Sequence, residues 1–378
     1  MHKYNWPLMS NNINEGDKKA LIKFIKSTDK FTQGKNVKRF EEKWSKWLGV
    51  KYSTFVNSGA SANFLSLKIL KDIKKNRSEV ILPAFTWSSD VNAVINSGFK
   101  PVFVDINLTN LALDEELVKK NISKKTAAIF LTHAMGFLGI SKSLLDYIKK
   151  RNILLIEDVC ESHGIHLNGK KGGSLGEISN FSFYYAHHIT TIEGGMISTN
   201  SKEIDILAKM KRGHGLLRDS QDSKLIKKTK SMYKDLNSDF IFLTEGFNFR
   251  SNELSAVIGL EQIKRLNRNI KIRNVNHKLF LKNLRKDVFI SDFNLSGSSN
   301  YGLHLIMKEK NKTMFKKVID TLTLNSIEYR IGSAGGGNQL RQPYLKNLRN
   351  KFNFKNLQNT EHMHFYSLYI GCLLYTSD

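Results

Sequence analysis

The chain is 378 residues long, 40% hydrophobic and 25% charged, a composition typical of a globular protein with a buried core. Its 59 Lys and Arg against 34 Asp and Glu give a net charge of +25, but the lysines are spread along the whole chain, which argues against nucleic-acid binding. No apolar run approaches the roughly 18 residues that span a membrane, and the start lacks the apolar stretch of a secretory signal. We therefore expect a cytoplasmic protein that contacts neither nucleic acid nor membrane.

The excess positive charge has two further interpretations. A general compositional bias is one, which the low proline count of 4 also indicates. Attraction of an anionic small substrate such as a nucleotide sugar is the other. The two cysteines, Cys160 and Cys372, are too few for a disulfide framework or for a four-thiolate metal or iron–sulfur site, so a reducing compartment and no metal are expected.

Short apolar runs in the first half of the chain predict the strands of a buried sheet. They lie at residues 80–82, 101–105, 127–131 and 153–156. Such runs without alternation are typical of strands that are buried on both faces. The stretches 90–95 and 142–150 between them look helical, and this alternation predicts a mainly parallel sheet covered by helices.

A long periodic stretch, residues 251–275, predicts one helix that begins a second domain. After it the pattern resets, with a strand predicted at 302–307 and a helix at 314–324. We therefore predict a large α/β domain over residues 1–250. A smaller α+β domain is predicted over residues 251–378.

Two segments carry residues suited to anion and cation binding. Small residues at 56–63 lie between a strand and a helix, where backbone amides and the helix dipole favour a phosphate; the alternative is an ordinary capped helix. Glu157 and Asp158 end a predicted buried strand, where ligands of open α/β sheets bind. A buried aspartate there needs a cationic partner, which is either a ligand or a structural salt bridge.

The stretch 181–195 is the most unusual, because His187 and His188 lie between an aromatic strand and a Glu-Gly-Gly turn. An imidazole at this place is a candidate general base, since it titrates near neutral pH; the alternative is a structural histidine. Sequential histidines point in different directions and no carboxylate lies at ligand spacing, so a metal site is disfavoured. His362 and His364, near the end of the chain, are interpreted as surface residues.

In their order and spacing these segments resemble the DegT/StrS-type sugar aminotransferase/dehydratase family, over nearly the whole chain. That family has the aspartate-aminotransferase fold (fold type I) and uses pyridoxal 5'-phosphate (PLP). The resemblance rests on residues 31–34, 40–41, 57–59, 83–87, 157–158, 173–176, 181–183, 193–195, 212–215 and 248–250.

The resemblance assigns cofactor contacts residue by residue. Ala60 and Ser61 would bind the cofactor phosphate at a helix N-terminus, and Ser182 would add a hydroxyl. Trp87 would stack on the pyridine ring, whose protonated nitrogen would pair with Asp158. The remaining contacts implied are Glu161 near the ring hydroxyl and Asn248 at the phosphate of a neighbouring subunit, which implies a homodimer with shared active sites.

One departure from the family pattern points to the reaction. Family aminotransferases place the Schiff-base lysine eight residues before the second Gly of Glu-Gly-Gly, and here that position is His187. No lysine lies between Lys171 and Lys202, and imidazole cannot form the covalent link that lysine forms. The substitution resembles the 3-dehydratases of 4-keto-6-deoxy nucleotide sugars, which serve lipopolysaccharide O-antigen synthesis in the family's usual setting.

The resemblance implies a lyase-type reaction. Glutamate would convert PLP to pyridoxamine 5'-phosphate (PMP), and His187 would act as acid and base while the 3-hydroxyl of a GDP-linked sugar leaves. A CDP-sugar relative carries an iron–sulfur cluster, which two cysteines argue against. The alternatives are a nucleotide-sugar aminotransferase of the same family and a non-catalytic basic binding protein on the same fold.

The substrate contacts and the end of the chain are further expectations. Arginine suits phosphate geometry, and the candidates for the substrate are Arg212, Arg218, Arg250 and Arg330. The glycine run 332–337 departs from the family's usual Arg-Pro. A last helix should follow Gly371, so we interpret the end of the chain as truncated.

Overall fold

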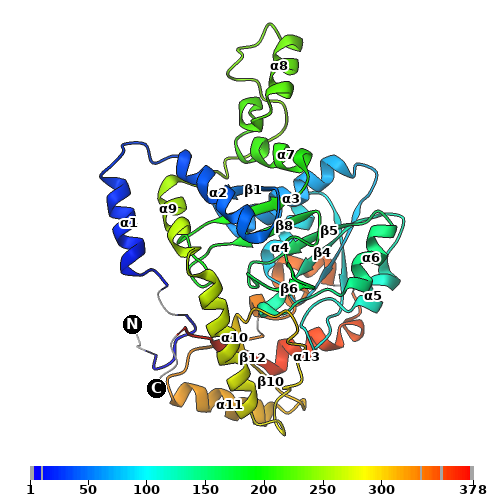
Figure 1. The fold of residues 1–378 in the computed structure, drawn as a ribbon. Helices are drawn as coiled ribbons and strands as arrows, with labels where there is room; N and C mark the ends of the chain where they lie inside the picture. The colour runs from blue at the N-terminus through cyan, green and yellow to red at the C-terminus, as the bar shows by residue number, and fades with distance from the viewer. Residues whose placement is uncertain (1–3, 10–11, 333, 350–351, 375–378) are drawn as a thin grey trace.

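The computed structural model describes residues 4–9, 12–332, 334–349 and 352–374, and the final residues 375–378 lie outside this range. A large α/β domain carries the seven-stranded sheet, a smaller domain carries the three-stranded sheet, and one helical segment runs from the first to the second (Figure 1). No helix in these ranges is both long enough and apolar enough to cross a lipid bilayer.

The large domain contains a seven-stranded sheet in which β1 and β9 run antiparallel to their neighbours and the other pairs are parallel. This agrees with the mainly parallel sheet that the apolar runs predict. Across the sheet the strands are β1 (Tyr52–Val56), β9 (Gly195–Thr199), β8 (Ile178–Ser182), β5 (Leu154–Asp158), β4 (Thr126–Thr132), β2 (Glu79–Pro83) and β3 (Lys100–Val104). A separate hairpin pairs β6 (His166–Leu167) with β7 (Lys170–Lys171).

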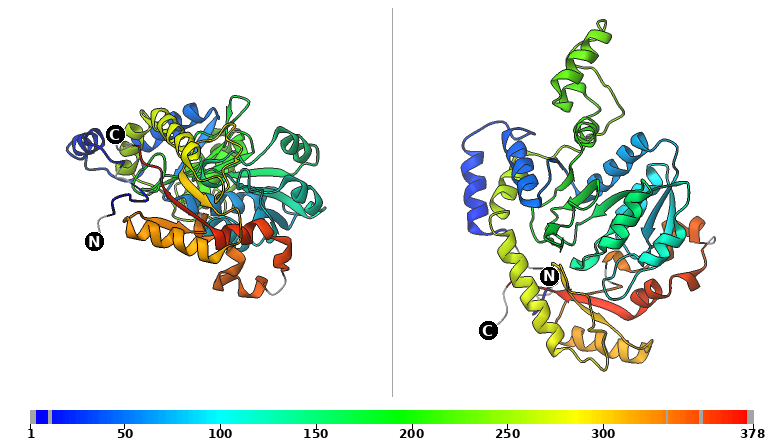
Figure 2. Two further views of the ribbon diagram at one scale, coloured as in Figure 1. Left: turned by 90° about the horizontal axis from the view of Figure 1, so that it is seen from below. Right: turned by 45° about the vertical axis from the view of Figure 1, so that its right-hand side comes forward.

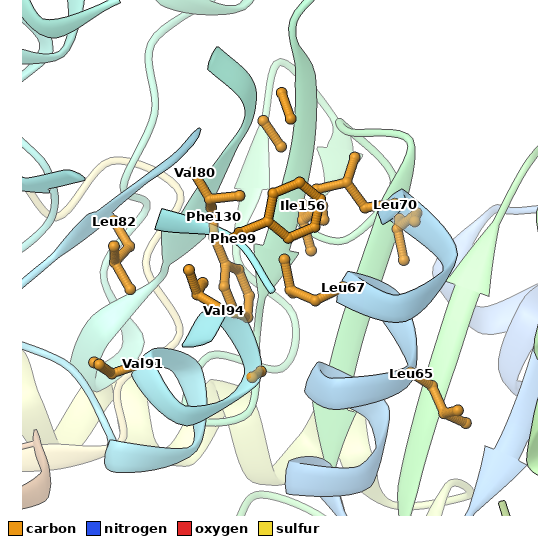
Figure 3. Packing of buried hydrophobic residues seen from close by; sticks show 14 of the residues in the cluster. Leu65, Leu67, Leu70, Val80, Leu82, Val91, Val94, Phe99, Phe130 and Ile156 are labelled. Atoms are coloured by element: carbon orange, nitrogen blue, oxygen red, sulfur yellow. The ribbon is translucent and has the colours of Figure 1, made fainter. Parts of the chain in front are cut away.

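Helices cover both faces of the sheet, because the central strands are apolar on both sides. One face packs against α3 (Gly59–Ile73), α4 (Ser88–Asn96) and α7 (Lys202–Arg212). Figure 3 shows this layer, with Leu67 of α3 and Val94 of α4 beside Phe130 and Ile156 of the sheet. The opposite face packs against α2 (Lys35–Leu48), α5 (Glu115–Asn121), α6 (Lys142–Lys150) and α9 (Glu253–Gln262).

The segment after residue 250 differs from the single helix that its periodicity predicts. It forms α9 and α10 (Leu266–Asn283), with a break between them. At this break Gln262 and Arg265 both bind Asp17 of α1 (Glu15–Ile25), and Arg265 makes a salt bridge with it. These polar contacts connect the N-terminal helix α1 to the domain boundary. Helical periodicity does not predict them, because Asp17 is far away in the sequence.

The small domain is built on a three-stranded antiparallel sheet, β10 (Gly302–Ile306), β12 (Ser367–Gly371) and β11 (Tyr329–Ile331). Its helices are α11 (Lys312–Leu324), α12 (Lys346–Arg349) and α13 (Gln358–Tyr366). The surface interpretation of two histidines of α13 is wrong. His362 is buried, and its Nε2 lies 2.7 Å from the Met307 carbonyl oxygen. His364 is half-buried on another side of the helix and accepts a hydrogen bond from the Asn338 amide.

One part of the large domain projects away from its body. The segment that carries α8 (Ser223–Met232) stands out beyond α7 in Figure 1 and in the right-hand view of Figure 2. Exposed apolar side chains lie on this arm, which comprises residues 217–243: Met232, Tyr233, Leu236, Phe240, Phe242 and Leu243.

Buried histidines make the small domain sensitive to acid. His304 of β10 is fully buried among Phe137, Phe293 and His277, and its ring nitrogens have no hydrogen-bond partner among the described residues. Burial, and secondly the charge of His277, lower the pKa of His304 to about 3.

We expect the free energy of unfolding to fall as pH drops below about 6.5. His304 then binds a proton in the unfolded chain, whereas in the folded protein it stays neutral. The loss from this residue is about 2 kcal/mol at pH 5, and His304→Leu should remove it. Urea unfolding at pH 7 and pH 5 measures the difference, and equal pH dependence in both proteins would contradict it.

Candidate active site

The candidate site is a pocket at the carboxyl ends of β4 and β5, between the N-terminus of α3 and the small domain. Its volume is about 320 Å³. A larger cavity of about 560 Å³ in the small domain has an almost wholly apolar lining, so it lacks the convergent polar groups of a catalytic site. The pocket is lined by Ser58, Gly59, Ala60, Trp87, Ser89, Thr132, Asp158, Cys160, Glu161, Ser182, Tyr184, Ala186, His187, Glu193, Tyr301, Arg330, Gly335 and Tyr369.

The first turn of α3 forms one end of the pocket. Ser58 caps the helix by accepting the Ser61 amide, so the turn begins in a fixed position. Gly59 and Ala60 line the pocket, where the first amides of a helix lack intrahelical partners and attract an anion. A Cβ at Gly59 would lie 2.6 Å from Cβ of Ser182, so only glycine lets the helix start approach this strand. The turn and the Ser182 hydroxyl fit a phosphate group.

Asp158 ends β5 and reaches the pocket with a carboxylate that is almost fully buried. Its Oδ2 accepts from Nδ2 of Asn63 at 2.7 Å, and its Oδ1 accepts from the Cys160 amide at 2.8 Å. In the described ranges no Lys, Arg or His forms an ion pair with it. A buried carboxylate without a protein cation fits a cationic ring nitrogen, as the resemblance implies for pyridine.

Trp87 and Glu161 approach the same space from two different loops. Trp87 precedes α4, and half of its side chain is exposed. Glu161 accepts the Met135 amide at Oε2. Burial raises the pKa of Glu161 to about 7, and the Asp158 charge adds to the shift. Glu161 is therefore able to gain or lose a proton near neutral pH.

His187 lies in the pocket wall, and none of the described residues that line the pocket is a lysine. Its ring packs against Tyr301 and Tyr184, with centroids 5.6 and 6.1 Å away. Burial lowers the pKa of His187 to about 3, and the nearby Arg273 guanidinium acts in the same direction. The imidazole is therefore neutral at pH 7 and is able to accept a proton.

His188 does not share this role. It is buried, its Nε2 lies 3.0 Å from the Asn300 carbonyl oxygen, and it is absent from the pocket lining. The two neighbouring histidines thus point in different directions, which leaves His187 as the histidine of this pocket and gives His188 a structural contact.

Ile192, in the turn after these histidines, has a strained backbone conformation. Its φ of 72° lies in the left-handed region, although it is β-branched and half of its side chain is exposed. An L-residue costs roughly 1–2 kcal/mol there, so we expect Ile192→Gly to stabilise the protein by about 1 kcal/mol. Urea unfolding measures this change, and a destabilised variant would show that the side chain makes compensating contacts.

Arg330 of β11 is the one predicted substrate arginine that lines the pocket. We correct the expectation for Arg212, whose guanidinium is 2% exposed. Its Nη1 donates to Glu41 Oε1 at 2.6 Å and to the Phe55 carbonyl at 2.8 Å, which fastens α7 to α2 and β1. Burial in this ion pair removes Arg212 from reach of a substrate.

Four other predicted residues lie outside the pocket lining of this chain. Ser61 turns its hydroxyl to Asn57, 2.6 Å away. Arg218 lies on the arm against Phe240, Arg250 contacts His214, and Asn248 pairs with Gly213 in an isolated bridge. The contact of Asn248 with the cofactor phosphate of a neighbouring subunit stays a prediction.

Sequence reasoning missed several lining residues. Tyr301 and Tyr369 come from the small domain, more than 100 residues after His187. No local motif marks them, because only the docking of the two domains brings them to the pocket. Ser58 lies inside the predicted segment 56–63, whereas Thr132 and Cys160 follow predicted strands; in each case the position at a strand or helix end is the signal in the sequence.

Fold and site together define a PLP-dependent enzyme of the aspartate-aminotransferase fold. The chain belongs to the DegT/DnrJ/EryC1/StrS aminotransferase family, whose model matches residues 11–370.

Relatives with a named activity are similar along almost the whole chain. GDP-4-keto-6-deoxy-D-mannose 3-dehydratase of Escherichia coli O55:H7 is 32% identical over 97% of this chain and 95% of its own length. A solved structure of the E. coli enzyme with bound hydrated PLP has a TM-score of 0.87 at 30% identity, covering 98% of this chain and 95% of that one. A structure of a GDP-4-keto-6-deoxymannose-3-dehydratase with a trapped PLP-glutamate geminal diamine has a TM-score of 0.85 at 30% identity, covering 97% and 95%.

Proposed function

We propose that this protein is a PLP/PMP-dependent 3-dehydratase of a GDP-linked 4-keto-6-deoxy sugar, with L-glutamate as amino donor. The observation that carries the proposal is the position of His187 in a pocket without a lining lysine among the described residues. The similarity to GDP-4-keto-6-deoxy-D-mannose 3-dehydratase supports the substrate class.

When bound, the cofactor supplies a primary amine for the sugar's 4-keto group and a ring that accepts electrons. The chain supplies the groups that hold this cofactor. The α3 turn and Ser182 would bind its phosphate, Trp87 would cover the ring face, and Asp158 would keep the ring nitrogen protonated. In the absence of a lysine link these contacts carry the whole affinity for PLP.

His187 would perform the proton transfers. A neutral imidazole is the base that removes a proton near the reacting amine. The imidazolium that results lies in a buried wall, which favours release of the proton. The departing 3-hydroxyl is the acceptor, so one residue serves both steps and ends neutral again.

The atoms and electrons balance with glutamate as the reductant. The sugar exchanges its 3-hydroxyl for hydrogen, and glutamate becomes 2-oxoglutarate and ammonia. Glutamate thus provides the two electrons that the deoxygenation consumes.

The polar groups of the small domain would receive the substrate. Arg330, Tyr301 and Tyr369 line the pocket opposite the cofactor contacts, and Arg330 is the cation among them. A homodimer with shared sites is proposed as well, because the resemblance assigns Asn248 to the phosphate of a neighbouring subunit and Asn248 does not line the pocket of its own chain.

A nucleotide-sugar aminotransferase is the second candidate, since the matching family model is named an aminotransferase family. Incubation of the PLP-loaded protein with glutamate and GDP-4-keto-6-deoxymannose separates the two. Release of ammonia with loss of the 3-hydroxyl supports dehydration. A stable 4-amino sugar that keeps its 3-hydroxyl would overturn it.

A further inference from the structure

A second buried carboxyl group lies directly behind Asp158. Asp90 of α4 is 0% exposed and does not line the pocket. The Nδ2 atom of Asn63 lies 2.8 Å from Asp90 Oδ1 and 2.7 Å from Asp158 Oδ2. An amide nitrogen carries two hydrogens, so Asn63 donates one to each carboxyl group and fixes the two groups relative to each other.

The other oxygen of Asp90 belongs to a closed ring of three oxygens. Thr132 Oγ1 lies 2.7 Å from Asp90 Oδ2, Thr86 Oγ1 lies 2.7 Å from Thr132 Oγ1, and Thr86 Oγ1 also contacts Asp90 Oδ2. Three hydrogen bonds require three hydrogens, and each hydroxyl supplies one. A hydrogen on Asp90 Oδ2 would supply the third, so the three contacts fit a protonated Asp90.

The surroundings agree with this count. The charged and titratable groups around Asp90 are Asp158 at the end of β5, Cys160 two residues later, and Tyr344 in the short turn Pro343–Leu345. Asp90 has no cationic partner among the ion pairs of the described residues. Burial, and secondly the Asp158 charge, raise the pKa of Asp90 well above its usual value, and they outweigh the Thr86 and Thr132 hydrogen bonds, which act to lower it.

Asp158 is the less suitable place for the shared proton. Its two oxygens accept from Asn63 and from the Cys160 amide, so both neighbours already act as donors. Asp158 also lines the pocket, where a cationic ring nitrogen would stabilise its negative charge.

We propose that Asp90 is a positioning residue: it stays a neutral carboxylic acid, and the single negative charge of the Asp90–Asp158 pair is thereby confined to Asp158, facing the cofactor ring. A second negative charge at this depth would repel the first. This inference rests on the PLP site, and it holds whichever sugar reaction the enzyme catalyses.

Infrared difference spectroscopy of the wild-type protein at pH 8 tests the proposal without turnover. We expect the carbonyl stretch of a protonated carboxylic acid, which Asp90→Asn removes and Asp158→Asn retains. The matched control is Asp205→Asn, because Asp205 is equally buried but paired with Lys209 at 2.7 Å. A missing band, or a band that disappears only in Asp158→Asn, would overturn the assignment.

The pH dependence of the free energy of unfolding is a second test, because a purely structural role of Asp90 would not change it. A raised pKa means that folded Asp90 holds a proton that the unfolded chain releases above about pH 4, so wild-type stability falls as pH rises. The unfolding constant of wild type relative to Asp90→Asn should therefore rise about tenfold per pH unit from pH 5 upward, until Asp90 ionises. Parallel profiles would contradict the proposal.

The affinity of the Asp90→Asn variant for PLP tests whether Asp90 acts on the cofactor site. Asparagine resembles a protonated aspartate, so Asp90→Asn should bind PLP within about threefold of wild type. A loss as large as that of Asp158→Asn would mean that Asp90 is ionised. If Asp90→Asn fails to fold, Thr132→Val serves instead: it removes one hydroxyl from the ring and should shift the infrared band, and an unchanged band would contradict the hydrogen-bonded ring.

Discussion

Replacing His187 with asparagine should reduce dehydration roughly 10²–10⁴-fold, which is the usual contribution of general acid–base catalysis. Asparagine keeps similar volume and polarity but takes up no proton at neutral pH. Because His187 contributes no covalent link, PLP binding should stay within about threefold of wild type. Ammonia release with the GDP-4-keto-6-deoxy sugar measures the first quantity, and fluorescence titration of the apoprotein with PLP measures the second.

The matched control is His166→Asn, which changes an exposed histidine outside the pocket. It should leave both quantities unchanged. Full turnover in His187→Asn would remove His187 from the reaction. A collapse of PLP affinity together with turnover would instead make it a cofactor contact.

The second large effect is expected for Asp158→Asn, which should weaken PLP binding by about 10²–10³-fold. Removing one partner of a buried charge pair costs about 3–5 kcal/mol, and the lower part of this range corresponds to such a loss. The amide keeps the shape of the side chain but cannot compensate a protonated ring nitrogen. Equilibrium titration of the apoprotein with PLP measures the change.

Asp205→Asn is again the control, since it neutralises a buried aspartate that lies in an ion pair with Lys209 rather than in the pocket. Unchanged PLP affinity in Asp158→Asn would show that the ring nitrogen is unprotonated or lies elsewhere. Loss of affinity in both variants would point to a general effect on folding.

The sequence predicts those parts of the fold that depend on local pattern. The apolar runs at 80–82 and 127–131 lie in strands β2 and β4, because a strand buried on both faces has to be apolar throughout. The predicted large sheet and the second, smaller sheet are both present. The spacing from Gly195 back to His187 locates the histidine that lines the pocket.

The remaining features depend on contacts between distant residues. Arg212 carries the same sequence signal as a substrate arginine, and only Glu41, 171 positions earlier, reveals its structural role. The break between α9 and α10 depends on Asp17, far away in the chain. Tyr301 reaches the pocket through domain docking. Pairing of polar groups accounts for the first two features and domain docking for the third, and hydrophobic periodicity encodes neither.

Reduction of the PLP-loaded protein with borohydride, followed by peptide mass spectrometry, tests whether any lysine binds the cofactor covalently. If His187 stands where a lysine would bind the cofactor covalently, no lysine should carry a reduced cofactor, and dialysis should remove the vitamin B6 compound from the protein. A stoichiometric adduct on any lysine would contradict the account.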